Sequence, residues 1–346
     1  MARISVILAI YNMESTIIDT MHSLLTQTAG DLEIIMVDAG SEDGTYEVCS
    51  GYLAMYSNVK VIQVAQHGNL SMARNVGLKM AEGSYVFFAQ GGVVYENDAL
   101  EKLCMPMREH QIDIAYGYFG ERAECEKQMQ EFVKGYQTDE KKTREWFLQY
   151  FPDEFILNLN NKMFRRELLM KKEIKFISSP SADRALFLLR YMQHVRNMVI
   201  VPERIVTGRL PKDRQAPAIF DWDMEKKVTI EYYRLAESWK YEMPQNKRMV
   251  LYFQEALVRH LQAVVLLGKN FPKPDKMKYY AQLAEDPWVH IMLSGEVSLG
   301  GFGGTVLGLF SSAQYMAMEG MLAAKNQVLG YKKGIKQIFK KNRNGD

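Results

Sequence analysis

Short apolar segments alternate with amphipathic segments over residues 4–89, and this alternation limits the possible folds more than any other feature. The apolar segments have the length of strands and contain few polar residues, as expected of strands that helices cover on both faces. Strands and helices that alternate at this spacing form a parallel sheet with right-handed crossovers. We therefore expect an α/β fold with strands at 4–10, 32–38, 59–64 and 85–89, and helices at 13–26, at 45–55 and from an N-capping Ser71 onward.

The stretch 69–92 places chemically useful residues at one edge of that sheet. Arg74 lies in the first turn of the third helix, and the strand that follows the helix runs out into Gln90-Gly91-Gly92. In open α/β sheets, ligands bind in the crevice outside the carboxyl ends of the strands. The sequence therefore predicts a ligand site at this edge.

Composition and motifs narrow the class of ligand. The chain has 346 residues, of which 47% are apolar, and a formal net charge of +2, so a large core is expected and a nucleic-acid-binding surface is not. No Gly-x-Gly-x-x-Gly follows the first strand and no phosphate-loop motif occurs, which disfavours a dinucleotide enzyme and a P-loop phosphotransferase. The three cysteines are scattered, as is typical of a reduced cytosolic protein.

The composition changes after Pro217, and the remainder is expected to be mainly helical. We expect one domain over 1–215 and a helical region over 216–346, and we interpret the glycine cluster 300–304 as a hinge or a tight helix entry. The helices are expected at 221–241, 246–268, 275–285 and 305–329, and a charged exposed insertion is expected at 121–144.

Membrane association is expected to be peripheral at most. No signal peptide opens the chain, and the most apolar segment, 297–324, is interrupted by polar residues and glycines, which favours a buried or surface helix over a membrane span. The basic tail 331–343 either touches an anionic membrane surface or is a solvated helix end. A cytoplasmic protein, peripheral at most to the inner face of the membrane, is the resulting expectation.

Four ordered blocks resemble the family 2 glycosyltransferases, which have the GT-A fold. The blocks are 4–12, 23–28, 33–45 and 69–77, and weaker likeness extends to 161–169 and 201–204. The resemblance implies a nucleotide-sugar donor and a glycan or lipid-linked acceptor.

Donor-binding roles follow from this resemblance for Tyr11, Asp38, Arg74 and Gln90. Tyr11 can stack on the base, Asp38 can accept hydrogen bonds from the base or ribose, and Arg74 can meet the nucleotide or its phosphates. Structural alternatives remain open at this stage: Tyr11 can cover the core edge, Asp38 can cap a loop, and Arg74 can form a surface ion pair.

The chain departs from the family at the usual metal motif. Where the family carries Asp-x-Asp, this chain has Gln90-Gly91-Gly92, and Ala39 replaces an acid that many members place next to Asp38. A neutral amide is a weak ligand for Mg²⁺ or Mn²⁺, and glycine offers no side-chain oxygen. The usual metal site is therefore expected to be absent, and a divalent cofactor is doubtful.

The resemblance also suggests a catalytic base. Asp183 occupies the position of the base in inverting members, and its alternative role is the N-cap of a helix over 184–191. Arg184 is a candidate partner for the diphosphate in place of a metal, and Lys162, Arg165 and Arg166 are either in the same neighbourhood or ordinary surface charges.

Two functions remain open from the sequence. One is a transferase, inverting by a single displacement. The other is a catalytically degenerate protein of the same shape that serves as a binding or accessory subunit of an active transferase.

Overall fold

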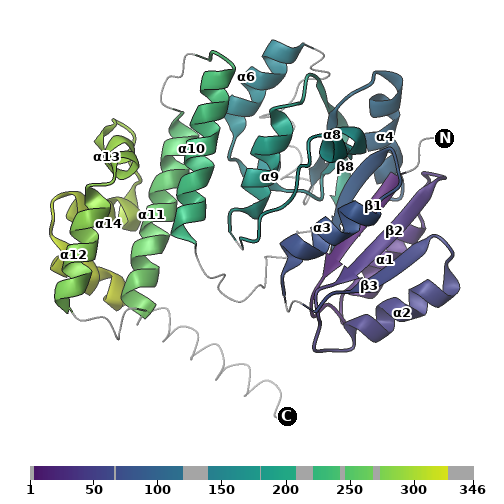
Figure 1. Ribbon diagram of the computed structural model, residues 1–346, viewed down its shortest axis with the longest axis horizontal. Coiled ribbons are helices and arrows are strands. Elements are labelled where there is room, and N and C mark those ends of the chain that lie inside the picture. The colour runs from purple at the N-terminus through teal and green to yellow at the C-terminus, as the bar shows by residue number, and fades with distance from the viewer. Residues whose placement is uncertain are drawn as a thin grey trace. The chain divides into compact units, whose positions relative to one another are not determined.

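The computed structural model describes residues 4–65, 68–119, 139–179, 181–207, 221–241, 246–267 and 273–325 (Figure 1). The basic tail 331–343 and most of the expected insertion, up to residue 138, lie outside these residues. By internal contacts the chain divides into two compact units, one of 1–219 with 230–243 and one of 220–229 with 244–346.

The described part of the first unit contains an eight-stranded sheet in the order β3-β2-β1-β4-β7-β6-β8-β5. Among these strands four pairings are parallel and three, β4 with β7, β6 with β7 and β5 with β8, are antiparallel. The α/β class with a mainly parallel sheet is therefore confirmed. The strands are β1 (Ile4–Ile10), β2 (Leu32–Asp38), β3 (Val59–Gln63), β4 (Tyr85–Gln90), β5 (Val94–Tyr95), β6 (Ile114–Phe119), β7 (Lys162–Arg165) and β8 (Met198–Thr207).

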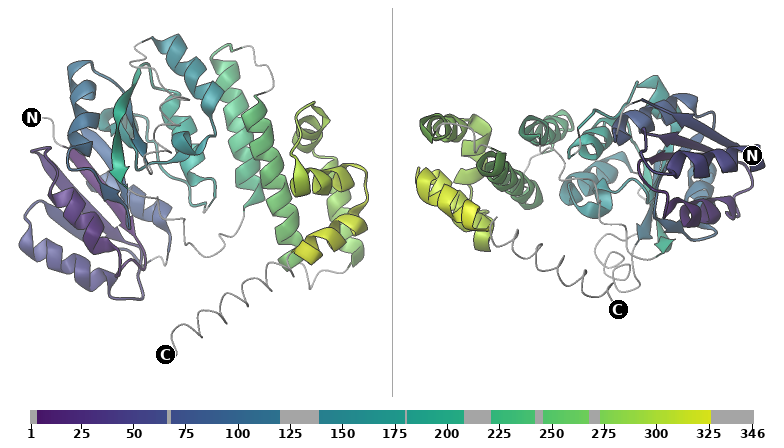
Figure 2. Two further views of the ribbon diagram at one scale, coloured as in Figure 1. Left: turned by 180° about the vertical axis from the view of Figure 1, so that it is seen from behind. Right: turned by 90° about the horizontal axis from the view of Figure 1, so that it is seen from below.

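Helices cover both faces of this sheet. In Figure 1, α3 lies in front of the strands, and α1 lies in front of them in the reversed view of Figure 2, so the two helices cover opposite faces. The helices in the described part of this unit are α1 (Ile17–Leu25), α2 (Thr45–Met55), α3 (Leu70–Met80), α4 (Ala99–Glu109), α6 (Glu140–Tyr150), α7 (Glu154–Leu157), α8 (Arg166–Lys171) and α9 (Asp183–Met192). A further helix, α10 (Trp222–Ser238), contributes residues to both units.

Close packing fixes α3 on the sheet. A Cβ added to Gly77 would lie 2.4 Å from the Cγ2 atom of Ile7 on β1, so only glycine permits this approach. The predicted N-cap at Ser71 is wrong: the Asn69 side chain accepts a hydrogen bond from the Met72 amide, and the helix begins at Leu70. Both residue types cap helices, and the one two positions earlier does so here.

An aromatic cluster fixes the start of α9 against the sheet. Phe176 and Phe187 stack with ring centroids 4.0 Å apart, and Phe88 on β4 meets both rings edge-on at 5.2 and 5.6 Å. All three side chains are buried. Edge-on and stacked pairs are favourable beyond the area they bury, so this cluster orients the helix that carries Asp183.

Glu33 is a fully buried carboxylate at the amino end of β2. Its Oε1 atom accepts from the Ser5 hydroxyl at 2.6 Å and from the amides of Glu82 and Gly83 at 2.8 and 3.1 Å, and its Oε2 atom pairs with Lys60 at 3.0 Å. A buried charge is tolerated only when it is paired and hydrogen-bonded in this way. Glu33 thereby ties the turn before β4 to the neighbouring strands.

The second unit is helical, as expected. Its helices include α11 (Lys247–Leu267), α12 (Lys273–Ala284), α13 (Pro287–Ser294) and α14 (Gly301–Ser311). The buried Gln254 of α11 donates to the carbonyls of Met292 and Val297 and accepts from the Leu299 amide, which holds the segment before α14. Within the described ranges, none of the helices has both the length and the hydrophobicity needed to cross a bilayer.

The glycine cluster 300–304 forms the start of a helix, which agrees with the second of the two expectations, a hinge or a tight helix entry. Gly300 is the N-cap of α14, Gly301 has a φ of +58°, and a Cβ on Gly304 would lie 2.0 Å from the Leu299 carbonyl oxygen. Side chains at these positions would strain or block the turn. The expected helix 305–329 was wrong in its bounds, because α14 ends at Ser311 and Ala313 turns the chain with a φ of +57°.

Candidate functional site

The predicted donor-binding residues lie at the carboxyl ends of three adjacent strands. In the parallel register Ile10 pairs with Asp38 of β2, and Ala9 pairs with Gln90 of β4. Tyr11 directly follows β1, the strand between the other two. Neighbouring strands are about 4.8 Å apart, so the backbones of Tyr11, Asp38 and Gln90 lie within about 10 Å of each other.

Tyr11 is half-buried and lies against the loop that leads into α3. A Cβ added to Gly68 would lie 3.4 Å from its ring, and Gly68 has a φ of +71° while its amide donates to the Ala39 carbonyl at 2.9 Å. The ring is therefore held between the end of β1 and the start of α3. It is placed beside the two elements that carry Asp38 and Arg74.

Asp38 is fully buried, and its carboxylate is occupied by protein groups. The Ser41 amide donates to it at 3.2 Å, the Ser41 hydroxyl also donates to it, and the Gln63 side-chain amide donates at 3.1 Å. This is the arrangement of the loop-capping alternative, in which an aspartate fixes the turn after a strand. A direct contact with a nucleotide stays a prediction.

Arg74 and Asp183 contact each other, although 109 residues separate them in the chain. Arg74 Nη1 lies 2.9 Å from Asp183 Oδ2, and the Ser71 hydroxyl donates to the same oxygen at 2.8 Å. The guanidinium also lies 5.4 Å from the centroid of the Phe176 ring. The starts of α3 and α9 thus meet around one carboxylate.

The N-cap alternative for Asp183 does not describe its position. The helix begins at Asp183 itself and Ala182 holds the N-cap place, while Asp183 Oδ1 accepts from the Arg184 amide at 2.8 Å. The carboxylate is buried and turned toward α3, where Ser71 and Arg74 bind it.

The end of β4 does not fit a divalent cation. In the segment Gln90-Gly91-Gly92 the one side-chain oxygen is Gln90 Oε1. This atom accepts a hydrogen bond from the Asn160 side-chain amide at 3.0 Å. The Met13 sulfur lies 3.1 Å from where a Cβ on Gly91 would be, and the Gly92 amide donates to Thr20. Hard cations require several carboxylate or carbonyl oxygens. Among the residues that the structure describes, no three His, Cys, Asp or Glu side chains are grouped as metal ligands.

Lys162 is a buried structural lysine, and its interpretation as a surface charge is wrong. Its ammonium donates to the carbonyls of Phe155 and Asn158 and to the Asn161 side chain, and it lies 4.8 Å from the centroid of the Tyr116 ring. Burial lowers its pKa well below the usual value, and the charge of Arg184 lowers this pKa further. The positive charge of Arg184 therefore acts on Lys162 in the same direction as burial does.

Arg165 and Arg166 do not share this neighbourhood. Arg165 ends β7 and Arg166 begins α8, and β7 runs antiparallel to β4, which places Arg165 opposite Tyr85. They are thus at the amino end of β4, away from Gln90. The expectation that they share the neighbourhood of Arg184 assumed a common edge, and the antiparallel direction of the short strand β7 excludes it.

Sequence reasoning missed the polar residues that hold the predicted ones in place. Ser71 binds Asp183, Asn160 binds Gln90, and Asn69 both caps α3 and donates to Ser178. A signal existed for Ser71, because residues three apart on a helix share a face and Ser71 stands three before Arg74. Asn160 gave no such signal, since only the fold brings it to β4.

Comparison with known sequences identifies relatives of the first unit. The family model described as Glycosyl transferase family 2 matches residues 5–171. EpsJ of Bacillus subtilis, described as an uncharacterized glycosyltransferase, is 36% identical over 111 residues, 32% of each chain. YibD of Escherichia coli, described in the same words, is 30% identical over 186 residues, 51% of this chain and 52% of YibD. The chain thus spans about half or less of the length of these curated relatives.

Comparison with solved structures finds the same fold. Staphylococcus aureus TarS 1-349 in complex with UDP has a TM-score of 0.59 at 18% identity, covering 94% of this chain and 91% of that chain. The mannosyltransferase PcManGT of Pyrobaculum calidifontis, solved with GDP-Man and Mn²⁺, has a TM-score of 0.52 at 15% identity, covering 94% and 87%. At these identities the likeness shows the GT-A fold.

Proposed function

Because residues 5–171 belong to glycosyl transferase family 2, we propose that this chain transfers a sugar from a nucleotide-sugar donor to a glycan or lipid-linked acceptor. The observation that carries the proposal is the convergence of Arg74 and Asp183 on one another from distant segments, beside the strand ends that hold Tyr11 and Gln90. Relatives include the putative teichuronic acid biosynthesis glycosyltransferase TuaG of B. subtilis. We assign this chain to bacterial polysaccharide synthesis on that basis.

The donor is held at the carboxyl edge of the sheet. Tyr11 stacks on the base, and the loop that Asp38 fixes through Ser41 shapes the adjoining wall. Arg74 binds the diphosphate, since guanidinium contacts to phosphate are strong and directional. Gln90, held by Asn160, donates from its amide to the sugar or phosphate.

Asp183 acts as the general base of a single displacement. It takes the proton of the acceptor hydroxyl while that oxygen forms a bond to the anomeric carbon, and the bond from this carbon to the phosphate oxygen breaks. The nucleoside diphosphate leaves with the electron pair, and configuration inverts. A positioned base of this kind contributes about 10²- to 10⁴-fold to the rate.

Binding of the donor and activation of the base are coupled in this proposal. In the structure Arg74 is paired with Asp183. A diphosphate that draws the guanidinium to itself leaves Asp183 Oδ2 with one lone pair for the acceptor hydroxyl, while the Ser71 hydroxyl keeps its hydrogen bond to the same oxygen. Without a donor the base is occupied.

No metal enters the proposed reaction, because the end of β4 does not fit one. The negative charge that develops on the leaving diphosphate is balanced by Arg74 and by Arg184, the first residue after the base. Preorganised cations in a water-poor site stabilise such charge without a bound metal.

A transfer assay with and without EDTA tests the proposal. Donors with different bases, UDP-, GDP- and dTDP-sugars, are first screened by thermal shift, because a ligand that binds the folded state raises its apparent stability. Turnover that persists in EDTA supports the proposal, and turnover that requires Mn²⁺ contradicts its metal-free form.

The accessory-subunit alternative predicts a different result. The loss of Asp-x-Asp at Gln90-Gly91-Gly92 is the observation that favours it. In that case a donor raises the melting temperature, yet no donor is hydrolysed or transferred unless a partner transferase is added.

A further inference from the structure

A cavity of about 560 Å³ lies at the opposite edge of the sheet from the proposed donor site. It is bounded by the start of β4, the end of α4 and the junction of β7 with α8, all within the first unit. Tyr85, Met107 and Met170 give it an apolar side. Its volume is in the range of small-molecule sites.

Four cationic side chains line this cavity against two acidic ones. The cations are Arg108, Arg165, Arg166 and Lys171, and the acids are Glu82 and Glu167. Glu82 already pairs with Lys60 at 3.3 Å, and Arg165 with Asp113 at 3.5 Å. The lining therefore carries an excess of positive charge that these ion pairs do not remove.

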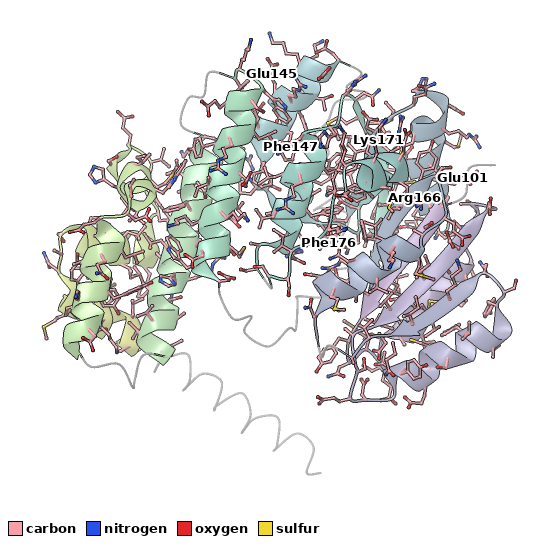
Figure 3. The ribbon with its side chains drawn as sticks, in the orientation of Figure 1. Glu101, Glu145, Phe147, Arg166, Lys171 and Phe176 are labelled. Atoms are coloured by element: carbon pink, nitrogen blue, oxygen red, sulfur yellow. The ribbon has the colours of Figure 1, made fainter. Side chains whose placement is uncertain are left out.

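Three of the cations have no ion-pair or hydrogen-bond partner for their side chains among the described residues: Arg108, Arg166 and Lys171. The Nε atom of Arg166 is, moreover, buried without a hydrogen-bond partner. A buried donor of this kind costs free energy unless a ligand or water satisfies it. Figure 3 labels Arg166 and Lys171, which belong to the same short helix, α8.

From this juxtaposition we propose that the cavity binds a phosphate-bearing anion. Guanidinium and ammonium groups bind phosphate oxygens through short charge-assisted hydrogen bonds, and Arg166 supplies the planar fork that suits them. The apolar wall of Tyr85, Met107 and Met170 accommodates the carbon part of a phosphorylated molecule. Two sources share this chemistry, a free phosphorylated metabolite and the headgroup of an anionic lipid.

This anion site is separate from the proposed transfer site and does not depend on that proposal. Tyr85 and Gln90 are the two ends of β4, so their backbones are about 17 Å apart at about 3.3 Å per residue. None of Tyr11, Asp38, Arg74, Gln90, Asp183 or Arg184 lines the cavity.

Calorimetric titration of the full chain with inorganic pyrophosphate tests the proposal. Arg166→Gln is expected to weaken binding about ten- to a hundredfold, and Lys171→Gln less, because each removes a charge-assisted contact. Lys142→Gln changes an exposed lysine outside the cavity and is expected to leave binding unchanged. Because a diphosphate can also enter the transfer site, Arg184→Ala is measured beside them and is expected to retain the Arg166-dependent binding.

A second arm identifies the source of the phosphate. Vesicles of phosphatidylcholine with and without phosphatidylglycerol are sedimented with the same variants. Binding to the anionic vesicles that Arg166→Gln abolishes assigns a lipid headgroup, and pyrophosphate binding alone assigns a free anion. The proposal is overturned if neither probe binds, or if Arg184→Ala abolishes binding while Arg166→Gln does not. Arg108→Gln and Lys171→Gln, both at exposed positions, replace Arg166→Gln if that variant does not fold.

Discussion

The two edges of the central sheet treat charge in opposite ways. At the carboxyl edge the charges proposed to react are paired, with Asp183 bound by Arg74 and Ser71. At the amino edge one carboxylate, Glu33, is buried and accepts from four donors, and three cations around a cavity have no side-chain partner within the described part of the chain. In the proposed reaction the pair of Arg74 and Asp183 at the carboxyl edge must separate. At the amino edge the hydrogen bonds of Glu33 hold the strands together, and the cations around the cavity are proposed to bind an anion.

The largest expected effect tests the carboxyl edge. Asp183→Asn keeps the shape of the side chain and removes its ability to take a proton, so the transfer rate is expected to fall about 10³-fold. Asp98→Asn, which changes a half-buried aspartate that pairs with Lys102, is the matched control and is expected to keep its rate. The measurement is the initial rate of sugar transfer at saturating donor for both variants and the parent chain. Equal rates in both variants would remove Asp183 from the reaction.

The second largest expected effect tests the hydrogen bonds of the buried Glu33 at the amino edge. Glu33→Gln replaces an acceptor that serves four donors by an amide with one oxygen, and leaves Lys60 without its nearest partner. Removing one partner from a buried hydrogen-bonded group costs about 1–3 kcal/mol. A loss of that size in urea unfolding is expected, against less than about 0.5 kcal/mol for Glu82→Gln, whose exposed pair with Lys60 contributes little.

A smaller expected effect separates the role of Arg74 in donor binding from its role in the ion pair with Asp183. Arg74→Lys keeps a charge near Asp183 but loses the planar fork, so donor affinity is expected to weaken about tenfold. The same variant is expected to melt within a few degrees of the parent, because a lysine can still pair with the carboxylate. A melting temperature that falls steeply while donor affinity is kept would show that Arg74 serves the fold alone.

The first four strands could be predicted from the sequence, because the pattern that indicates each strand lies within the strand and its flanking residues. The first four strands were placed within one residue, since each is a short, mainly apolar segment bounded by polar or glycine residues. The helix α13 was missed, although Asp286 caps it and Pro287 opens it, because a short helix has little periodicity to detect.

Non-local features could not be predicted in this way. The insertion of the antiparallel strand β7 between β4 and β6 depends on pairings between segments about 80 residues apart, and it sent Arg165 and Arg166 to the opposite edge from Gln90. The contact of Arg74 with Asp183 and the burial of Lys162 have the same origin. The residue types indicated which side chains were candidates for the site. The order and direction of the strands decided at which edge of the sheet each candidate lies.

The smallest expected effect is a pH dependence at the amino edge. The hydrogen bond from Lys60 to Glu33 raises the pKa of Lys60 above its usual 10.5, burial opposes this shift, and Glu82 adds to it. Since the folded state holds this proton more tightly than the unfolded chain, the stabilisation is complete below pH 10.5 and is lost as the pH rises through the folded pKa. The melting temperature is therefore expected to fall more steeply above pH 10.5 in the parent chain than in Lys60→Met, which has no proton to lose there. Equal slopes would mean that Glu33 is satisfied by its backbone and hydroxyl donors alone, and the charge pair would then contribute nothing to stability.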